Sequence, residues 1–152
     1  EVVVSGPTVL RGYHRNPEAT AKAIHYSELY TGDMVHMDED GDLWLVQRRS
    51  DLIVSGGENV YPAEVEAVLR AHPSVSDVCV VGVDDTEWGQ AVAAAVVIAG
   101  DGELEPSELI GYSREHLAGY KQPRRVLIVN ALPQTASGKV QRSKVRELFG
   151  DV

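Results

Sequence analysis

Hydrophobic and polar positions follow two different periods from about residue 51 onward. Val75 to Val83 and Gln90 to Ala99 are nearly continuous apolar runs, rich in β-branched residues or alanine, which is typical of buried strands. Pro62 to His72 and Pro106 to Leu117 carry apolar residues at helical spacing, and each begins with a proline, which suits the first position of a helix. Strands and helices in this mixed order predict a small α+β domain.

Two further elements complete the predicted domain. A third strand is expected at Arg124–Val129, and a short last helix at Arg142–Phe149. Near the start of the first helix, Glu64 and Glu66 are expected to put negative charge into the first turn, where the helix dipole favours it.

The first fifty residues predict a β-rich segment. Glu1 to Val4 is expected to be a strand, and a chain that starts directly in a strand is typical of a fragment cut from a longer one. Met34–Met37 and Leu43–Val46 flank an Asp-Gly pair, which predicts a hairpin. The acidic residues 38–42 lack the ligand spacing of an EF-hand, so we interpret them as a turn and not as a calcium site.

Composition narrows the class of protein. A formal net charge of −9 argues against a nucleic-acid-binding surface, which is normally basic. No apolar run is long enough for a membrane span, and the start of the sequence lacks a signal-peptide pattern. The single cysteine, Cys79, lies in an apolar run and is interpreted as a buried core residue. The composition as a whole is that of a cytoplasmic protein. The five histidines show no metal-ligand spacing, so we expect no metal site in this chain.

Three short motifs contain residue types that can do chemistry. Tyr30-Thr31-Gly32-Asp33 ends a strand with a carboxylate, which either closes a turn or accepts hydrogen bonds from ligand hydroxyls. Ser55-Gly56-Gly57-Glu58 contains a glycine pair that lets a ligand approach the main chain closely. Ser137-Gly138-Lys139 lacks the earlier glycine and the following Ser or Thr of a Walker A loop. Taken alone, this lysine is either a solvated surface residue or a cation used in catalysis.

These three motifs, in this order, resemble those of the adenylate-forming superfamily of acyl- and aryl-CoA ligases, peptide-synthetase adenylation domains and luciferases. The string S-G-G-E-N-V-Y-P-A-E-V-E is most similar to o-succinylbenzoate, halobenzoate and fatty-acid CoA ligases, and L-P-Q-T-A-S-G-K-V-Q-R matches the superfamily's C-terminal motif. The resemblance implies that residues 1–49 end a large N-terminal AMP-binding domain and that residues 50–152 form a mobile C-terminal lid domain. It implies an α+β lid with a three-stranded mixed sheet, helices and a two-stranded hairpin, preceded by a β-rich tail.

The resemblance implies a reaction in two steps. ATP, accompanied by Mg²⁺, and a carboxylic acid give an acyl-adenylate and pyrophosphate; CoA then takes the acyl group as a thioester, and AMP leaves. Residues that match Asp33 and Arg48 contact the ribose of ATP in the family. The residue that matches Lys139 contacts the acid carboxylate and the α-phosphate, where its charge offsets the repulsion between two anions. Ser50 and Asp51 lie where the family has its hinge.

The second step is assigned by the same resemblance to another surface of the lid. The lid rotates about the hinge, Lys139 leaves the reaction centre, and the glycine loop enters it. Gly56 and Gly57, followed by Glu58, then form the wall of the tunnel for the pantetheine arm of CoA, where a larger side chain would block the thiol.

Three more residues match CoA contacts. Trp88 matches a residue that stacks on the CoA adenine, although a lone tryptophan after a strand is as often a packing residue. Arg124 matches a residue that meets CoA phosphates, for which a planar guanidinium is well suited. Some relatives have a second cation where this chain has Gln122, and Lys121 is a candidate to replace it.

The family's phosphate loop and acid pocket lie upstream of these motifs and are not in these 152 residues. We therefore predict that the isolated chain is an inactive fragment of an acid–thiol ligase and that its partners include the N-terminal domain. Whether the acid substrate is fatty or aromatic, and whether the protein forms a homodimer, are left open. Two alternatives also stay open: a peptide-synthetase-type enzyme that loads a carrier protein, and a non-catalytic lid or binding module that acts in trans.

Overall fold

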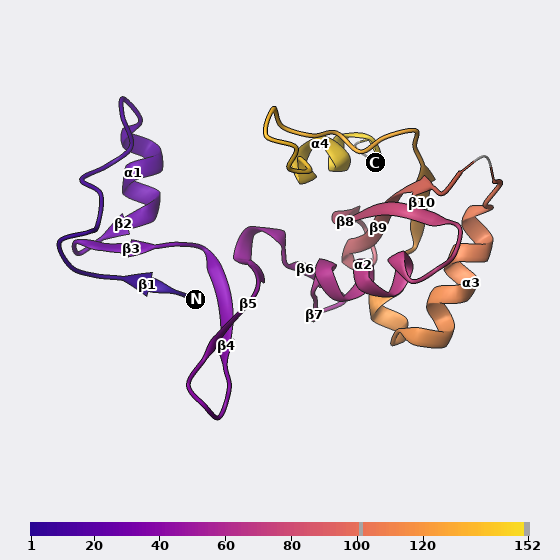
Figure 1. Cartoon of the computed structure of the whole chain (residues 1–152), viewed down its shortest axis with the longest axis horizontal. Coiled ribbons are helices and arrows are strands. Elements are labelled where there is room, and N and C mark those ends of the chain that lie inside the picture. The colour runs from indigo at the N-terminus through magenta and orange to yellow at the C-terminus, as the bar shows by residue number, and fades with distance from the viewer. Residues whose placement is uncertain (101, 151–152) are drawn as a thin grey trace. The chain divides into compact units, whose positions relative to one another are not determined.

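The computed structural model describes residues 1–100 and 102–150, and the side chains of residues 46, 47 and 49 lie outside that description. The chain divides into two units, Glu1–Ser50 and Asp51–Val152 (Figure 1). We call them unit 1 and unit 2 and describe each by itself. That unit 1 ends a larger AMP-binding domain remains a prediction.

Unit 1 contains a small sheet, one helix and a hairpin. The sheet has the order β1-β3-β2, with all pairs antiparallel, and its strands are β1 (Val3–Val4), β2 (Ile24–His25) and β3 (Glu28–Tyr30). Helix α1 (Pro17–Ala23) begins where the side chain of Asn16 accepts a hydrogen bond from the Ala19 N–H, a standard N-cap. Strands β4 (Asp33–Met37) and β5 (Leu43–Arg48) form the hairpin that the Asp-Gly pair predicted. A 3₁₀ turn, η1 (Arg49–Asp51), crosses the division between the units.

Unit 2 is built around one mixed sheet. Its strands are β6 (Ile53–Ser55), β7 (Glu58–Val60), β8 (Val75–Asp85), β9 (Gly89–Ile98) and β10 (Arg125–Ile128). Strand β9 is central, since it pairs antiparallel with β8 and parallel with β10. The β6–β7 hairpin joins β9 only at the Ser55–Gly89 pair. The predicted α+β lid, with a three-stranded mixed sheet and a hairpin, is therefore confirmed, and the hairpin extends the sheet to five strands.

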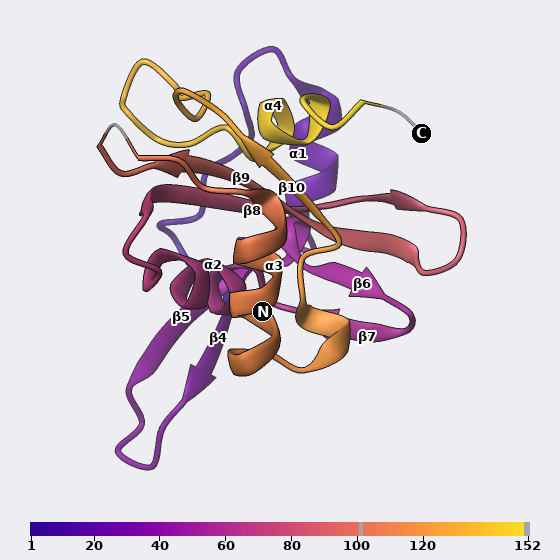
Figure 2. The ribbon, with the colours of Figure 1, turned by 90° about the vertical axis from the view of Figure 1, so that its right-hand side faces the viewer.

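Helices cover both faces of this sheet. Even-numbered residues such as Val80 and Ala94 pack in one core cluster with residues of α2 (Pro62–Arg70) and α3 (Pro106–His116). Odd-numbered residues such as Val81 and Ala93 pack in a second cluster with residues of α4 (Arg142–Glu147). Helix α4 lies on the other side of the sheet from α2 and α3 (Figure 2). Because both faces are buried, the middle of β8 and of β9 is apolar on both sides, and so the two strands appear in the sequence as nearly continuous apolar runs.

Cys79 and Glu66 are both buried in unit 2, and the sequence predicted only the first. Cys79 is buried in the second cluster, as predicted. The role given to Glu66 is wrong: only Glu64 lies in the first turn of α2, whereas Glu66 is buried one turn later and pairs with Arg142. Among the helices of the described residues, none has the length and apolarity that crossing a membrane requires.

Candidate functional site

The predicted ribose contacts lie side by side in unit 1. Asp33 and Arg48 are paired residues of the β4–β5 hairpin, and Arg48 Nε lies 3.0 Å from Asp33 Oδ1. The Thr31 hydroxyl accepts a hydrogen bond from the Asp33 N–H and donates one to the Val2 carbonyl, which fixes the turn before the strand. The Arg48 side chain is 67% exposed, so the ion pair contributes about 0–1 kcal/mol. A ligand diol can therefore compete for this carboxylate at little cost.

The glycine loop of unit 2 is the turn between β6 and β7. Gly56 and Gly57 have φ angles of +60° and +86°, in the left-handed region that favours glycine. Gly56 has a second constraint, because a Cβ on it would lie 2.6 Å from Cε3 of Trp88. Its N–H also donates to the Trp88 carbonyl. A Cβ on Gly57 would meet no atom within 4 Å, and Glu58 is exposed, so this side of the turn is open.

Trp88 is held in place by a turn and a glycine. Oδ1 of Asp85 accepts hydrogen bonds from the N–H groups of Glu87 and Trp88, which shapes the connection between β8 and β9. The indole Nε1 of Trp88 and Oγ of Ser55 are buried and have no hydrogen-bond partner among the described residues.

A basic cavity lies beside this tryptophan. The guanidinium of Arg124 sits 4.2 Å from the centre of the Trp88 ring. Arg124 also lines a cavity of about 320 Å³ together with Arg114, from the last turn of α3. Two arginines that line one cavity suit a phosphate group, because a guanidinium can donate two parallel hydrogen bonds to it. The sequence interpretation missed Arg114, which looks like an ordinary charged residue at the end of a helix.

Lys121, the proposed replacement cation, is already engaged in this structure. Its Nζ lies 2.7 Å and 2.8 Å from the two carboxylate oxygens of Glu64 on α2. The hydrogen bond that Lys121 donates to Glu64 raises the pKa of Lys121. The neighbouring Gln122 donates to the Leu117 carbonyl, a contact that ties the loop to the end of α3. A role of Lys121 toward CoA would require it to leave Glu64.

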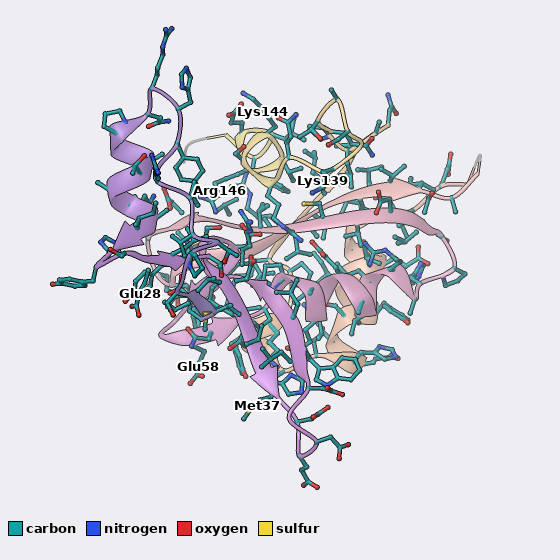
Figure 3. The ribbon with its side chains drawn as sticks, turned by 60° about the vertical axis from the view of Figure 1, so that its left-hand side comes forward. Glu28, Met37, Glu58, Lys139, Lys144 and Arg146 are labelled. Carbon is teal, nitrogen blue, oxygen red and sulfur yellow. The ribbon has the colours of Figure 1, made fainter. Side chains whose placement is uncertain are left out.

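Lys139 lies on an exposed loop that is closed at its base. The bridge between Gln134 and Val140 joins the two arms, and the backbone of Thr135 exchanges hydrogen bonds with those of Gly138 and Lys139. The Lys139 N–H also donates to the Thr135 hydroxyl. The loop is therefore ordered by its backbone, while the Lys139 side chain is exposed to solvent. Lys139 and Glu58 lie on opposite sides of unit 2 (Figure 3).

Three residues after Lys139, Arg142 connects α4 to the interior of unit 2. Its guanidinium pairs with both carboxylate oxygens of Glu66 and donates to the Val80 carbonyl at 2.8 Å. Arg142 Nε lies 3.4 Å from Asp51 Oδ2. Burial opposes the charge, but the hydrogen bonds and charge of Glu66 outweigh it and raise the pKa of Arg142. Within the described residues, no group of three or more His, Cys, Asp or Glu side chains is placed to hold a metal ion.

Comparisons with known proteins agree with this fold. Residues 64–139 match the family model "AMP-binding enzyme C-terminal domain". A 2-succinylbenzoate–CoA ligase from Geobacillus kaustophilus is 48% identical over 149 residues, which is 98% of this chain and 30% of the ligase.

Two solved structures are similar as well. The o-succinylbenzoate CoA synthetase from Bacillus subtilis, in complex with the acyl-adenylate intermediate OSB-AMP, has a TM-score of 0.80 and 39% identity over 99% of this chain and 30% of its own. The amide bond synthetase McbA from Marinactinospora thermotolerans has a TM-score of 0.83 and 44% identity over 98% of this chain and 30% of its own.

The fold and the family match define this chain as a C-terminal domain of an AMP-binding enzyme. The chain belongs to the AMP-binding enzyme C-terminal domain family, and it spans about a third of the length of the relatives that it matches.

Proposed function

We propose that this chain is the C-terminal part of an ATP-dependent acid–CoA ligase that forms an acyl-adenylate and then a thioester. The observation that carries the proposal is the separation of two kinds of chemistry on unit 2. Lys139 stands on an exposed loop, and Glu58, at the end of the glycine turn, lies on the opposite side of unit 2 (Figure 3). Trp88 and Arg124 belong to the side of the glycine turn, because Trp88 packs on Gly56 and Arg124 packs on Trp88. A lid that presents one side and then the other can serve two half-reactions at one centre.

In the adenylation step, a carboxylate oxygen of the acid attacks the α-phosphorus of ATP and pyrophosphate leaves. Lys139 offsets the repulsion between these two anions and the charge that develops on the leaving group. Asp33 accepts hydrogen bonds from the ribose hydroxyls, and Arg48, whose Nε lies 3.0 Å from Asp33 Oδ1, also reaches the ribose. Mg²⁺ accompanies ATP as part of the substrate, and the described residues of this chain supply no cluster of ligands for it.

In the thioester step, the CoA sulfur attacks the acyl carbon of the adenylate and AMP leaves with the electron pair of the broken bond. Gly57 offers an open wall for the pantetheine arm, since nothing occupies the space where its Cβ would be. An adenine that stacks on Trp88 must displace the Arg124 guanidinium from the ring, and a cation–π contact at an exposed site is worth only about 0.5–1 kcal/mol. The displaced guanidinium is then available, with Arg114, for CoA phosphates.

Ser50 and Asp51 are the proposed hinge between the two states. They lie in the short 3₁₀ turn where unit 1 meets unit 2. A few residues in such a turn can absorb the backbone rotation that lid movement needs. A cytoplasmic location is part of the proposal, because the only cysteine is a free, buried thiol, as in proteins of reducing compartments.

The proposal is tested in a hybrid ligase. In it, this chain replaces the matching 149 residues of the Geobacillus kaustophilus 2-succinylbenzoate–CoA ligase. We expect the hybrid to exchange pyrophosphate into ATP with 2-succinylbenzoate and to convert supplied adenylate and CoA into the thioester. The isolated chain is expected to do neither. A folded hybrid that performs neither half-reaction, or robust turnover by the isolated chain, contradicts the proposal.

A second candidate differs in the group that accepts the acyl chain. The 44% identity with the amide bond synthetase McbA favours an amine as an alternative acceptor. In that case the adenylation step is unchanged, and the tryptophan–arginine surface has no CoA to bind. Competition between CoA and a primary amine for adenylate formed by the hybrid separates the two, because thioester as the main product supports CoA and amide as the main product supports the amine.

A further inference from the structure

Arg142 has a geometry that goes beyond a simple packing role. Its guanidinium reaches three separate elements: Glu66 on α2, the Val80 carbonyl on β8, and Asp51 in the 3₁₀ turn at the predicted hinge. Glu66 is 8% exposed and its Oε1 also accepts a hydrogen bond from the Val80 N–H. Arginine, carboxylate and backbone therefore form a closed ring of hydrogen bonds in the interior of unit 2.

The lysine loop ends directly before this arginine. The Gln141 N–H donates to the Pro133 carbonyl at 2.8 Å, and its side-chain amide donates to the Gln134 carbonyl at 2.8 Å. These two contacts hold the arms of the loop together just before α4 begins at Arg142. The base of the Lys139 loop thus leads directly into Arg142, which adds a polar attachment to the interior of unit 2 beside the apolar packing of Leu132 and Val140.

We propose that Arg142 is a positioning residue for Lys139: it holds the base of the lysine loop on the buried Glu66–Val80 anchor. The expected effect of Arg142 on adenylation rests on the proposed function. Its effect on the order of the lysine loop does not, because the contacts involved lie within this chain. Lys139 must place one charge between two anions, and a displacement of about 1 Å can lower a rate about 100-fold. If the loop loses this anchor, unit 2 stays folded, but the Lys139 side chain then samples many positions.

Three variants separate positioning from folding. Arg142→Met keeps the length of the side chain and removes its donors, but leaves the Glu66 carboxylate buried and unpaired, which destabilises the fold. The double variant Glu66→Gln plus Arg142→Met removes both charges, so its stability is expected to recover. Arg146→Met makes the same substitution one turn later on α4, at an exposed side chain, and is the matched control.

In the hybrid ligase, we expect the double variant to lose roughly 10- to 100-fold in kcat for adenylation, with a smaller change in the KM for ATP. Thioester formation from supplied adenylate is expected to stay within about twofold of the parent, as is every rate of Arg146→Met. Arg142→Lys, which keeps a donor at the same site, is expected to recover part of the adenylation rate. If adenylation recovers together with stability in the double variant, Arg142 is only structural and the inference is overturned.

Amide hydrogen exchange on the 152-residue chain itself tests the structural half without any activity. We expect the amides of Gly138, Lys139 and Gln141 to exchange at least about tenfold faster in the double variant, because local opening of the loop becomes easier. Amides of β9 and every amide of Arg146→Met are expected to keep their parent rates. Unchanged exchange in the loop overturns the inference even if the hybrid ligase is fully active. Faster exchange in the loop supports it even if the hybrid proves inactive and the proposed function fails.

Discussion

The guanidinium of Arg124 lies 4.2 Å from the centre of the Trp88 ring, and a Cβ on Gly56 would lie 2.6 Å from Cε3 of the same ring. Three positions that are far apart in the sequence thus form one surface on unit 2. The glycine gives the ring room, the ring supports the arginine, and the arginine faces a cavity that Arg114 also lines. Each residue of this proposed CoA-binding surface can therefore be tested by its own substitution.

Trp88 is expected to act through its ring face. Stacking of a base on an aromatic side chain is worth about 1–3 kcal/mol, so Trp88→Ala should raise the KM for CoA in the hybrid ligase about tenfold. Trp88→Phe, which keeps a ring, should raise it less, and adenylation should be unchanged in both. Steady-state kinetics with CoA as the varied substrate measures this. A KM for CoA that stays at the parent value in Trp88→Ala would remove this residue from the CoA site.

The two glycines of the turn are expected to differ in what they tolerate. Gly57→Ala strains only the left-handed backbone and should lower the free energy of unfolding by about 1 kcal/mol. Gly56→Ala adds the clash with Trp88 and should cost about 1–3 kcal/mol more. Urea unfolding of the isolated chain gives both values. Equal losses in the two variants would show that the contact with Trp88 does not constrain the turn.

Cys79 is expected to make unfolding depend on pH in alkaline solution. Burial raises the pKa of its thiol from 9.0 to about 11. Above pH 9 the unfolded chain releases this proton while the folded chain keeps it, so stability falls between about pH 9 and 11. The loss is on the order of 2–3 kcal/mol at the upper end.

The measurement is the difference in unfolding free energy between the parent and Cys79→Ala, taken at pH 8 and at pH 11. The difference cancels the other groups that titrate in this range. The advantage of the parent over Cys79→Ala should shrink or reverse at the higher pH. A difference that is the same at both values contradicts the raised pKa.

The sequence was informative where local chemistry decides the structure. The apolar runs at Val75–Val83 and Gln90–Ala99 predicted the central strands within two residues, because strands buried on both faces are apolar along most of their length. Proline at Pro62 and Pro106 marked two helix starts for an equally local reason. The three motifs predicted the family through residue types at fixed spacing.

The sequence was uninformative where the partner is distant. Glu66 near a helix start suggested an interaction with the helix dipole, whereas its partner Arg142 is 76 residues further along the chain. Arg114 gave no signal, because only the fold brings the end of α3 next to Arg124. The contact between Gly56 and Trp88 likewise depends on the pairing of β6 with β9. Such contacts follow from topology, which local patterns do not encode.

The central claim is that Lys139 and the glycine turn serve different half-reactions. It is tested most directly by measuring both half-reactions of the hybrid ligase in Lys139→Ala and Gly57→Leu. Gly57 suits this comparison because its Cβ position is open, although its φ of +86° adds strain that unfolding measurements must account for. Lys139→Ala should slow pyrophosphate exchange about 100-fold or more and leave thioester formation from supplied adenylate intact. Gly57→Leu should block thioester formation and leave exchange intact; equal losses in both half-reactions for both variants would contradict the account.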